Sequence, residues 1–133
     1  MNAHVKAAVE ECTRASDEES MTFPEVVAKL NAAGVERYRA DLLRAEKTYY
    51  LPDGASHVVP AARLGAAAAR DFSPDGVRDA VRAIQARRLS YKAFCERIAA
   101  AGCVDYVVSL AGRRAVYFGR TGESYVEPFP AAK

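Results

Sequence analysis

The sequence predicts an α+β protein built from two copies of a helix–helix–strand–strand–strand unit, with an antiparallel sheet or sheets and the helices packed on one side. Three observations predict this class. Residues 21–60 repeat at 89–128 without a gap, at an offset of 68 residues. A stripe of apolar residues at helical spacing begins each copy, and an alternating pattern typical of strands follows it. The two units predict either one sheet or two packed halves related by a pseudo-twofold axis.

The repeat includes glycines, tyrosines and prolines that are identical in both copies. Most of the remaining pairs belong to the same chemical class, which indicates an internal duplication. The identical pairs are Ala32/Ala100, Ala33/Ala101, Gly34/Gly102, Tyr38/Tyr106, Leu42/Leu110, Tyr49/Tyr117, Gly54/Gly122, Ser56/Ser124, Val58/Val126 and Pro60/Pro128.

Helix signals precede the strands in each copy. Apolar residues at helical spacing predict a first helix over about 4–16. Thr22 with Glu25 three residues later forms a capping-box pattern, and Gly34 stands where a left-handed residue ends a helix. Ser90 and Gly102 occupy the matching places in the second copy. The stripes are Phe23, Val26, Val27, Leu30 and Ala33, and Tyr91, Phe94, Cys95, Ile98 and Ala101.

Strand signals follow each of these glycines. Tyr38, Ala40 and Leu42 alternate on one face, as do Val104, Tyr106, Val108 and Leu110 in the second copy. Residues 47–51 and 115–119 predict second strands, and 56–59 and 124–127 predict third strands. The Ser73-Pro74-Asp75 segment caps a further helix. We therefore predict a single domain, 1–133, with repeats at about 4–60 and 73–128 and an alanine-rich connector at 61–72.

Composition excludes several classes. The net charge of +2 favours neither nucleic acid nor a membrane, and no apolar run approaches the length of a membrane span. The N-terminal stretch, which contains Glu10 and Glu11, does not read as a signal peptide. Three cysteines without a CxxC motif indicate reduced core thiols and a cytoplasmic protein. Two separated histidines make no metal-ligand set, so we expect neither a metal nor a cofactor.

Two stretches resemble the YbcV-like family of small bacterial and prophage proteins, some of which carry the label phage envelope protein. These stretches are residues 34–38, Gly-Val-Glu-Arg-Tyr, and residues 49–54, Tyr-Tyr-Leu-Pro-Asp-Gly. The resemblance extends over about residues 22–130. It implies a shared α+β fold and carries no activity, cofactor or catalytic residue.

The candidate site lies where the two copies differ. Arg37, Arg39 and Asp41 alternate away from Tyr38 and the core. If Thr48 and Tyr50 face the core, as Val116 and Phe118 would in the second copy, then Lys47 and Tyr49 join the charged face. Guanidinium groups and a tyrosine hydroxyl would suit a small anion. The alternative is a solvated sheet face with cross-strand ion pairs.

The sequence favours a non-enzymatic binding or interaction module, with any small anionic ligand on this face of the first repeat. One alternative is a small enzyme that uses Arg37, Tyr49 and His57 on an anionic substrate. A catalytic triad around His57 has no supporting motif. A further alternative is a phage-derived structural protein. The apolar strand at 103–108 also predicts a homodimer, with Val107, Ala111 and Tyr117 covered by the second subunit.

Overall fold

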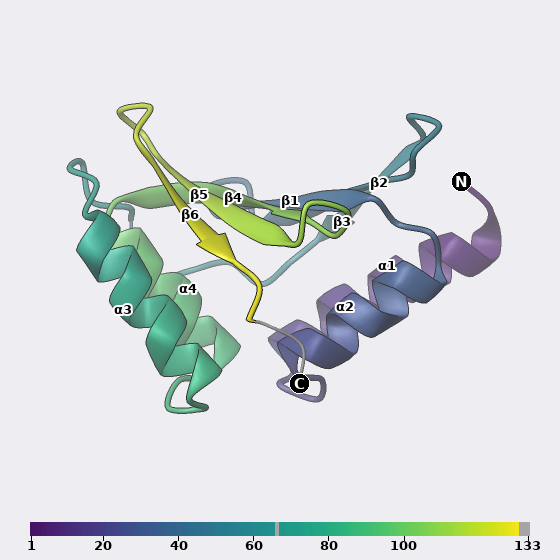
Figure 1. Ribbon diagram of the computed structural model, residues 1–133, viewed down its shortest axis with the longest axis horizontal. Helices are drawn as coiled ribbons and strands as arrows, with labels where there is room; N and C mark the ends of the chain where they lie inside the picture. The colour runs from purple at the N-terminus through teal and green to yellow at the C-terminus, as the bar shows by residue number, and fades with distance from the viewer. Residues whose placement is uncertain (66, 131–133) are drawn as a thin grey trace.

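The computed structural model describes residues 1–65 and 67–130, and this part of the chain contains four helices and six strands. Figure 1 shows the helices on one side of a single sheet, arranged as two separate pairs. In chain order the elements are α1 (Ala3–Asp17), α2 (Phe23–Ala32), β1 (Arg37–Asp41), β2 (Glu46–Tyr50), β3 (Ser56–Pro60), α3 (Pro74–Gln85), α4 (Tyr91–Ala100), β4 (Cys103–Ser109), β5 (Arg114–Gly119) and β6 (Ser124–Pro128).

The predicted caps define the helix ends. Thr22 accepts a hydrogen bond from the backbone N–H of Glu25, and the Glu25 carboxylate accepts one from the N–H of Thr22, which completes the capping box. Ser73 and Ser90 cap α3 and α4 in the same way through one side-chain bond each. Gly34 follows α2 with φ 81°, in the left-handed region that the sequence predicted.

The six strands form one antiparallel sheet in the order β3-β2-β1-β4-β5-β6. The predicted α+β class is therefore confirmed, with helices on one side of an antiparallel sheet. The central pair, β1 and β4, joins the two halves, and Arg39 lies opposite Val107 in its register. These two residues are equivalent positions of the sequence repeat, so the pairing has local twofold symmetry at this point.

The core lies between the sheet and the helices. Leu30 and Ile98, from the predicted stripes of α2 and α4, are fully buried. On the sheet, Tyr38 and Tyr106 face the helices and are almost completely buried. We call this helix-covered face the inner face and the opposite one the outer face. The outer face of the edge strands is open, since Val58 and Val126 are about half exposed.

The predicted connector contributes backbone rather than regular structure. Residues 61–65 and 67–72 form neither helix nor strand, and Ala66 lies outside the described residues. Asp71 and Phe72 pass directly against Gly102, which has φ 94°. A Cβ atom at Gly102 would lie 2.3 Å from the Asp71 carbonyl oxygen. Close backbone contact, in addition to the left-handed conformation, therefore requires glycine at this position.

Gly34 and Gly102 provide a matched test of this contact, because both have positive φ but only Gly102 meets a neighbour. We expect Gly34→Ala to lower the free energy of unfolding by about 1 kcal/mol, the cost of the left-handed conformation alone. Gly102→Ala should cost roughly 1–3 kcal/mol more, because the connector must move. Urea denaturation measures both values, and equal losses would contradict the close packing of Asp71 and Phe72 on Gly102.

Candidate functional site

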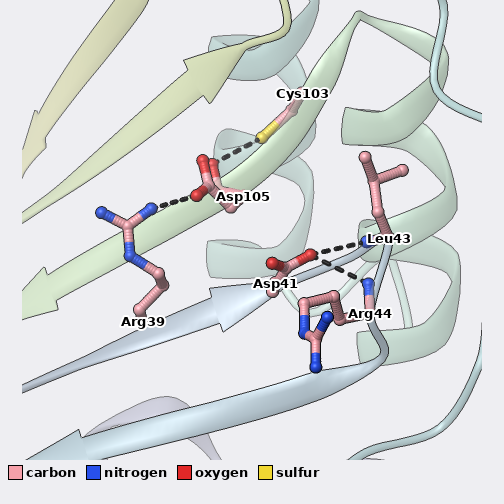
Figure 2. Close-up of polar contacts among 6 residues, drawn as sticks. All are labelled: Arg39, Asp41, Leu43, Arg44, Cys103 and Asp105. Atoms are coloured by element: carbon pink, nitrogen blue, oxygen red, sulfur yellow. Dashed lines mark hydrogen bonds and ion pairs between the residues drawn. The ribbon is translucent and has the colours of Figure 1, made fainter.

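Three of the predicted site residues lie on the outer face of β1, and each has a local partner. Arg39 forms an ion pair with Asp105 of β4, and Asp41 accepts hydrogen bonds from the backbone N–H groups of Leu43 and Arg44 at 3.0 and 2.9 Å (Figure 2). Arg37 stacks on the ring of Tyr50, with its Cζ atom 3.9 Å from the ring centroid. Each of the three charged side chains therefore interacts with a neighbouring strand or with the hairpin turn.

Lys47 and Tyr49 do not share this face, so that part of the sequence interpretation is wrong. Residues 42–45 connect β1 to β2 in a register that places Arg39 opposite Thr48 and Tyr38 opposite Tyr49. Cross-strand partners point to the same side of a sheet. Thr48 therefore belongs to the outer face, and Tyr49 belongs to the inner face, where it is 1% exposed.

The prediction for the second copy is wrong in the same way. Ala115 and Tyr117 are buried on the inner face, whereas Val116 and Phe118, which we expected in the core, face outward. Tyr117 therefore cannot belong to the outer surface that we assigned to a second subunit. The register of the two hairpins sets both faces, and a shift of one residue in the assumed register exchanges them.

His57 lies on the inner face of the edge strand β3, opposite Tyr49. Its Nε2 is 2.9 Å from a carboxylate oxygen of Glu10 on α1. The Tyr49 hydroxyl, in turn, is 2.8 Å from the hydroxyl of Thr13 on the same helix. Both residues thus attach α1 to the sheet, and the structure does not bring either one together with Arg37, which lies on the other face.

A cleft of about 540 Å³ opens on the inner face of the sheet, between the two helix pairs. Its two walls come from equivalent positions of the repeat. Met21, Phe23 and Val26 form part of one wall, and Leu89, Tyr91 and Phe94 form the matching part of the other. The segment Pro128–Pro130 borders the cleft, with the Phe129 ring edge-on to Phe23 at 5.5 Å between centroids.

The floor of this cleft contains Lys47, which is only 4% exposed. Its amine makes no hydrogen bond and no ion pair within 4 Å with the residues that the structure describes. Its nearest ring is Tyr91, with Nζ 4.5 Å from the ring centroid, and the Tyr38 ring follows at 5.8 Å. Burial lowers the pKa of the Lys47 amine, because removal from water disfavours the ammonium form. An amine in this setting can act as a base, a nucleophile or a partner for an anion.

Four tyrosines line the same cleft as the amine. The hydroxyl groups of Tyr91 and Tyr106 are hydrogen-bonded at 2.6 Å, and Tyr38 and Tyr117 also line the cleft. Burial raises the pKa of Tyr38, Tyr91 and Tyr106 well above the usual value, so these groups remain protonated. The cleft therefore combines apolar walls with one amine and several neutral hydroxyl groups.

The floor is asymmetric although the walls are not. Lys47 has Ala115 as its equivalent in the second half, and Thr13, which binds the Tyr49 hydroxyl, has Val81. The Tyr117 hydroxyl therefore has no counterpart of the Thr13 bond. Sequence reasoning found the difference between Lys47 and Ala115 but assigned it to the wrong face. The signal that could have corrected it is the tyrosine that is identical in both copies, Tyr49 and Tyr117, as core tyrosines are. Lys47 lies two residues before Tyr49 and therefore faces the same side of the sheet.

The three cysteines are core residues, as the sequence predicted. Cys12, Cys95 and Cys103 are buried and form no disulfide. Burial raises the pKa of the Cys95 thiol to about 11 and that of Cys103 to about 12. Thiols with such pKa values are weak nucleophiles at neutral pH.

This arrangement defines an α+β protein with a cleft between two helix pairs on one face of an antiparallel sheet. The chain belongs to a family of proteins of unknown function, DUF1398, which matches residues 57–127. The matched segment runs from β3 into β6 and includes Tyr91, Tyr106 and Tyr117, whereas Lys47 precedes it. No curated protein matches the chain. The resemblance to YbcV-like proteins remains a prediction. In the described residues, no helix has the length and apolar character needed to cross a membrane.

The pH dependence of stability tests the burial of Lys47. In the folded protein the pKa of the Lys47 amine lies below the ordinary value of 10.5. Between these two pKa values the unfolded chain therefore binds more protons than the folded protein does. The contribution of Lys47 to the free energy of unfolding therefore rises with pH across this interval. Lys47→Met removes it, so the variant should be more stable than wild type at neutral pH, by about 1.4 kcal/mol per unit of pKa depression. This advantage should shrink as the pH approaches 10.5.

Urea denaturation at several pH values measures this difference, with Lys92→Met on the exposed side of α4 as the control. The other groups that influence the amine are present in both proteins, so the measured difference reports Lys47 together with its electrostatic coupling to them. They are Asp17, Cys12 and Cys95, with the rings of Tyr38 and Tyr91. A pH-independent difference between Lys47→Met and wild type would mean that the amine is solvated.

Proposed function

We propose that the protein binds a small molecule in the cleft between its helix pairs, with an acceptor oxygen of the ligand directed at Lys47. The observation that carries this proposal is a buried amine, with no ion pair to any residue that the structure describes, on the floor of a cleft of about 540 Å³. A buried charge without a partner costs stability. A ligand oxygen that accepts from the amine would offset that cost and would gain affinity from the same contact.

The size and lining of the cleft support this function. Clefts of roughly 300–1,000 Å³ hold most small-molecule ligands, and they combine apolar walls with a few polar groups that fix orientation. Here Phe23, Val26 and Phe94 supply apolar surface, and the Tyr91–Tyr106 hydroxyl pair and Lys47 supply polar contacts. The preferred ligand thus has an apolar body and one carbonyl or carboxylate group.

The enzyme that the sequence suggested, with Arg37, Tyr49 and His57 as its site, has less support. Arg37 stacks on Tyr50 on the outer face, and the other two residues contact α1 on the inner face. General acid–base or nucleophilic chemistry requires the participating groups to meet at one reacting atom. The binding function does not depend on these three residues.

A thermal-shift screen tests the location of the ligand. The panel contains aliphatic and aromatic carboxylic acids and carbonyl compounds, measured with wild type, Lys47→Met and the Arg37→Ala/Arg39→Ala double variant. A ligand at 100 times its Kd should stabilise wild type by about 2.7 kcal/mol. We expect the double variant to keep this shift and Lys47→Met to lose most of it.

The opposite pattern, with the shift lost in the double variant and kept in Lys47→Met, would place the ligand on the outer face and overturn the proposal. The absence of any shift across the panel would also count against a small-molecule cleft. Lys92→Met is the control for a general effect of removing an amine, and it should respond to ligands as wild type does.

The homodimer remains a proposal of its own, supported by valines at four of the six positions in one row across the outer face. The register aligns Val58 with Thr48, Thr48 with Arg39, and Val107 with Val116 and Val126. Light scattering at micromolar concentration should give twice the mass of the chain. A monomer would contradict the dimer, and larger assemblies would instead favour the structural role that the phage label suggests.

A further inference from the structure

We propose that the Lys47 amine captures an aldehyde or ketone as an imine on the floor of the cleft. This inference rests on the proposed function, because it takes the cleft as the place where the ligand binds. It narrows the ligand class from molecules with an acceptor oxygen to carbonyl compounds. It also gives Lys47 a chemical role in addition to binding.

The position of the amine suits this reaction. Lys47 lines the cleft, and its Nζ lies beside the aromatic rings of Tyr91 and Tyr38 rather than beside a carboxylate. The described part of the chain has no fully enclosed side-chain nitrogen or oxygen that lacks a hydrogen bond. Since the amine makes no such bond with the described residues, it is not fully enclosed, and a carbonyl carbon would approach through this small opening.

Imine formation requires a neutral amine, and the surroundings favour that form. Burial is the main cause that lowers the pKa of this amine, and Asp17, Cys12 and Cys95 counteract it from α1 and α4. A larger fraction of the amine is therefore unprotonated near neutral pH than for a lysine in water. A lysine held in an apolar pocket is activated as a nucleophile in this way.

The reaction is balanced without any further reagent. The Nζ lone pair forms a bond to the carbonyl carbon, and the π pair of the C=O bond moves to oxygen, which takes up a proton released by the nitrogen. In the resulting carbinolamine, the nitrogen lone pair forms the C=N bond as the C–O bond breaks. The hydroxyl group leaves as water with the remaining nitrogen proton.

The Tyr91–Tyr106 hydroxyl pair can relay these protons. The two oxygens are 2.6 Å apart, and the ring of Tyr91 is the one nearest to the amine. Both hydroxyls remain protonated, so each can donate one proton while it accepts another. The amine itself makes no hydrogen bond to this pair, so a carbonyl compound bound between them would complete the relay from the nitrogen to the oxygen.

The second half has no equivalent amine on the floor of the cleft, because Ala115 stands at the position that corresponds to Lys47. The chain has five lysines, at positions 6, 29, 47, 92 and 133. Lys6 and Lys92 are exposed on helices and serve as internal references for unspecific labelling. Peptide mapping therefore distinguishes the cleft amine from solvent-exposed ones.

Reductive trapping tests the proposal on the full chain. The protein is incubated with equimolar hexanal or benzaldehyde, sodium borohydride is added to convert the imine to a secondary amine, and the modified lysines are identified by mass spectrometry. We expect at least tenfold more label at Lys47 than at Lys6 or Lys92 near neutral pH. Labelling of Lys47 should also persist to lower pH than labelling of the exposed lysines.

Two further measurements separate the inference from the proposed function. Tyr91→Phe should slow trapping at Lys47 and shift its pH profile, because it removes one hydroxyl of the pair. A thermal shift with the aldehydes and equal labelling of all lysines would overturn the imine but leave the cleft a binding site. If the aldehydes give no thermal shift and no selective labelling, and the carboxylic acids give no thermal shift either, both the imine and the binding function are overturned.

Discussion

The pairing of β1 with β4 is the contact on which the rest of the architecture depends. It joins two three-stranded halves into one six-stranded sheet, with Arg39 opposite Val107 at the centre. Because equivalent strands pair in antiparallel orientation, the helix pairs of the two halves lie on the same face and on opposite sides of this centre. The space between them is therefore a consequence of the pairing and requires no additional element.

This geometry gives the cleft its symmetric walls and leaves its floor free to differ. The walls come from loops and helix starts that occur in both halves, such as Met21 with Leu89 and Phe23 with Tyr91. The floor comes from inner-face strand positions next to the central pair. A single difference there, such as lysine in place of alanine, changes the chemistry of the cleft while the walls stay the same.

Much of the fold could be predicted because its signals are local. The Thr22–Glu25 capping box and the left-handed glycines fix helix ends through contacts within a few residues. The candidate site could not be placed in the same way. The faces of β2 and β5 depend on the hairpin register, and an error of one residue moves Lys47 from the inner face to the outer one.

The cleft itself was also beyond a reading of the sequence, because its walls come from segments about 68 residues apart that the β1–β4 pairing brings to the same face of the sheet. The strand pattern predicted a core position for Tyr38 and Tyr106, and that position is confirmed. It could not distinguish a tyrosine packed against a helix, such as Tyr49, from one that borders open space, such as Tyr117.

Burial of the Lys47 amine costs stability, whereas the apolar packing of the rest of the inner face stabilises the fold. Its neighbours on the sheet are aromatic or aliphatic, and a methionine of similar length would fill the same volume without the cost of burying an amine. On Asp105, by contrast, the adjacent Arg39 guanidinium acts against the effect of burial and favours the charged carboxylate. An ionisable residue that is held in the core without an ion-pair partner among the described residues, and that lines a cleft, is better explained by what it binds than by what it stabilises.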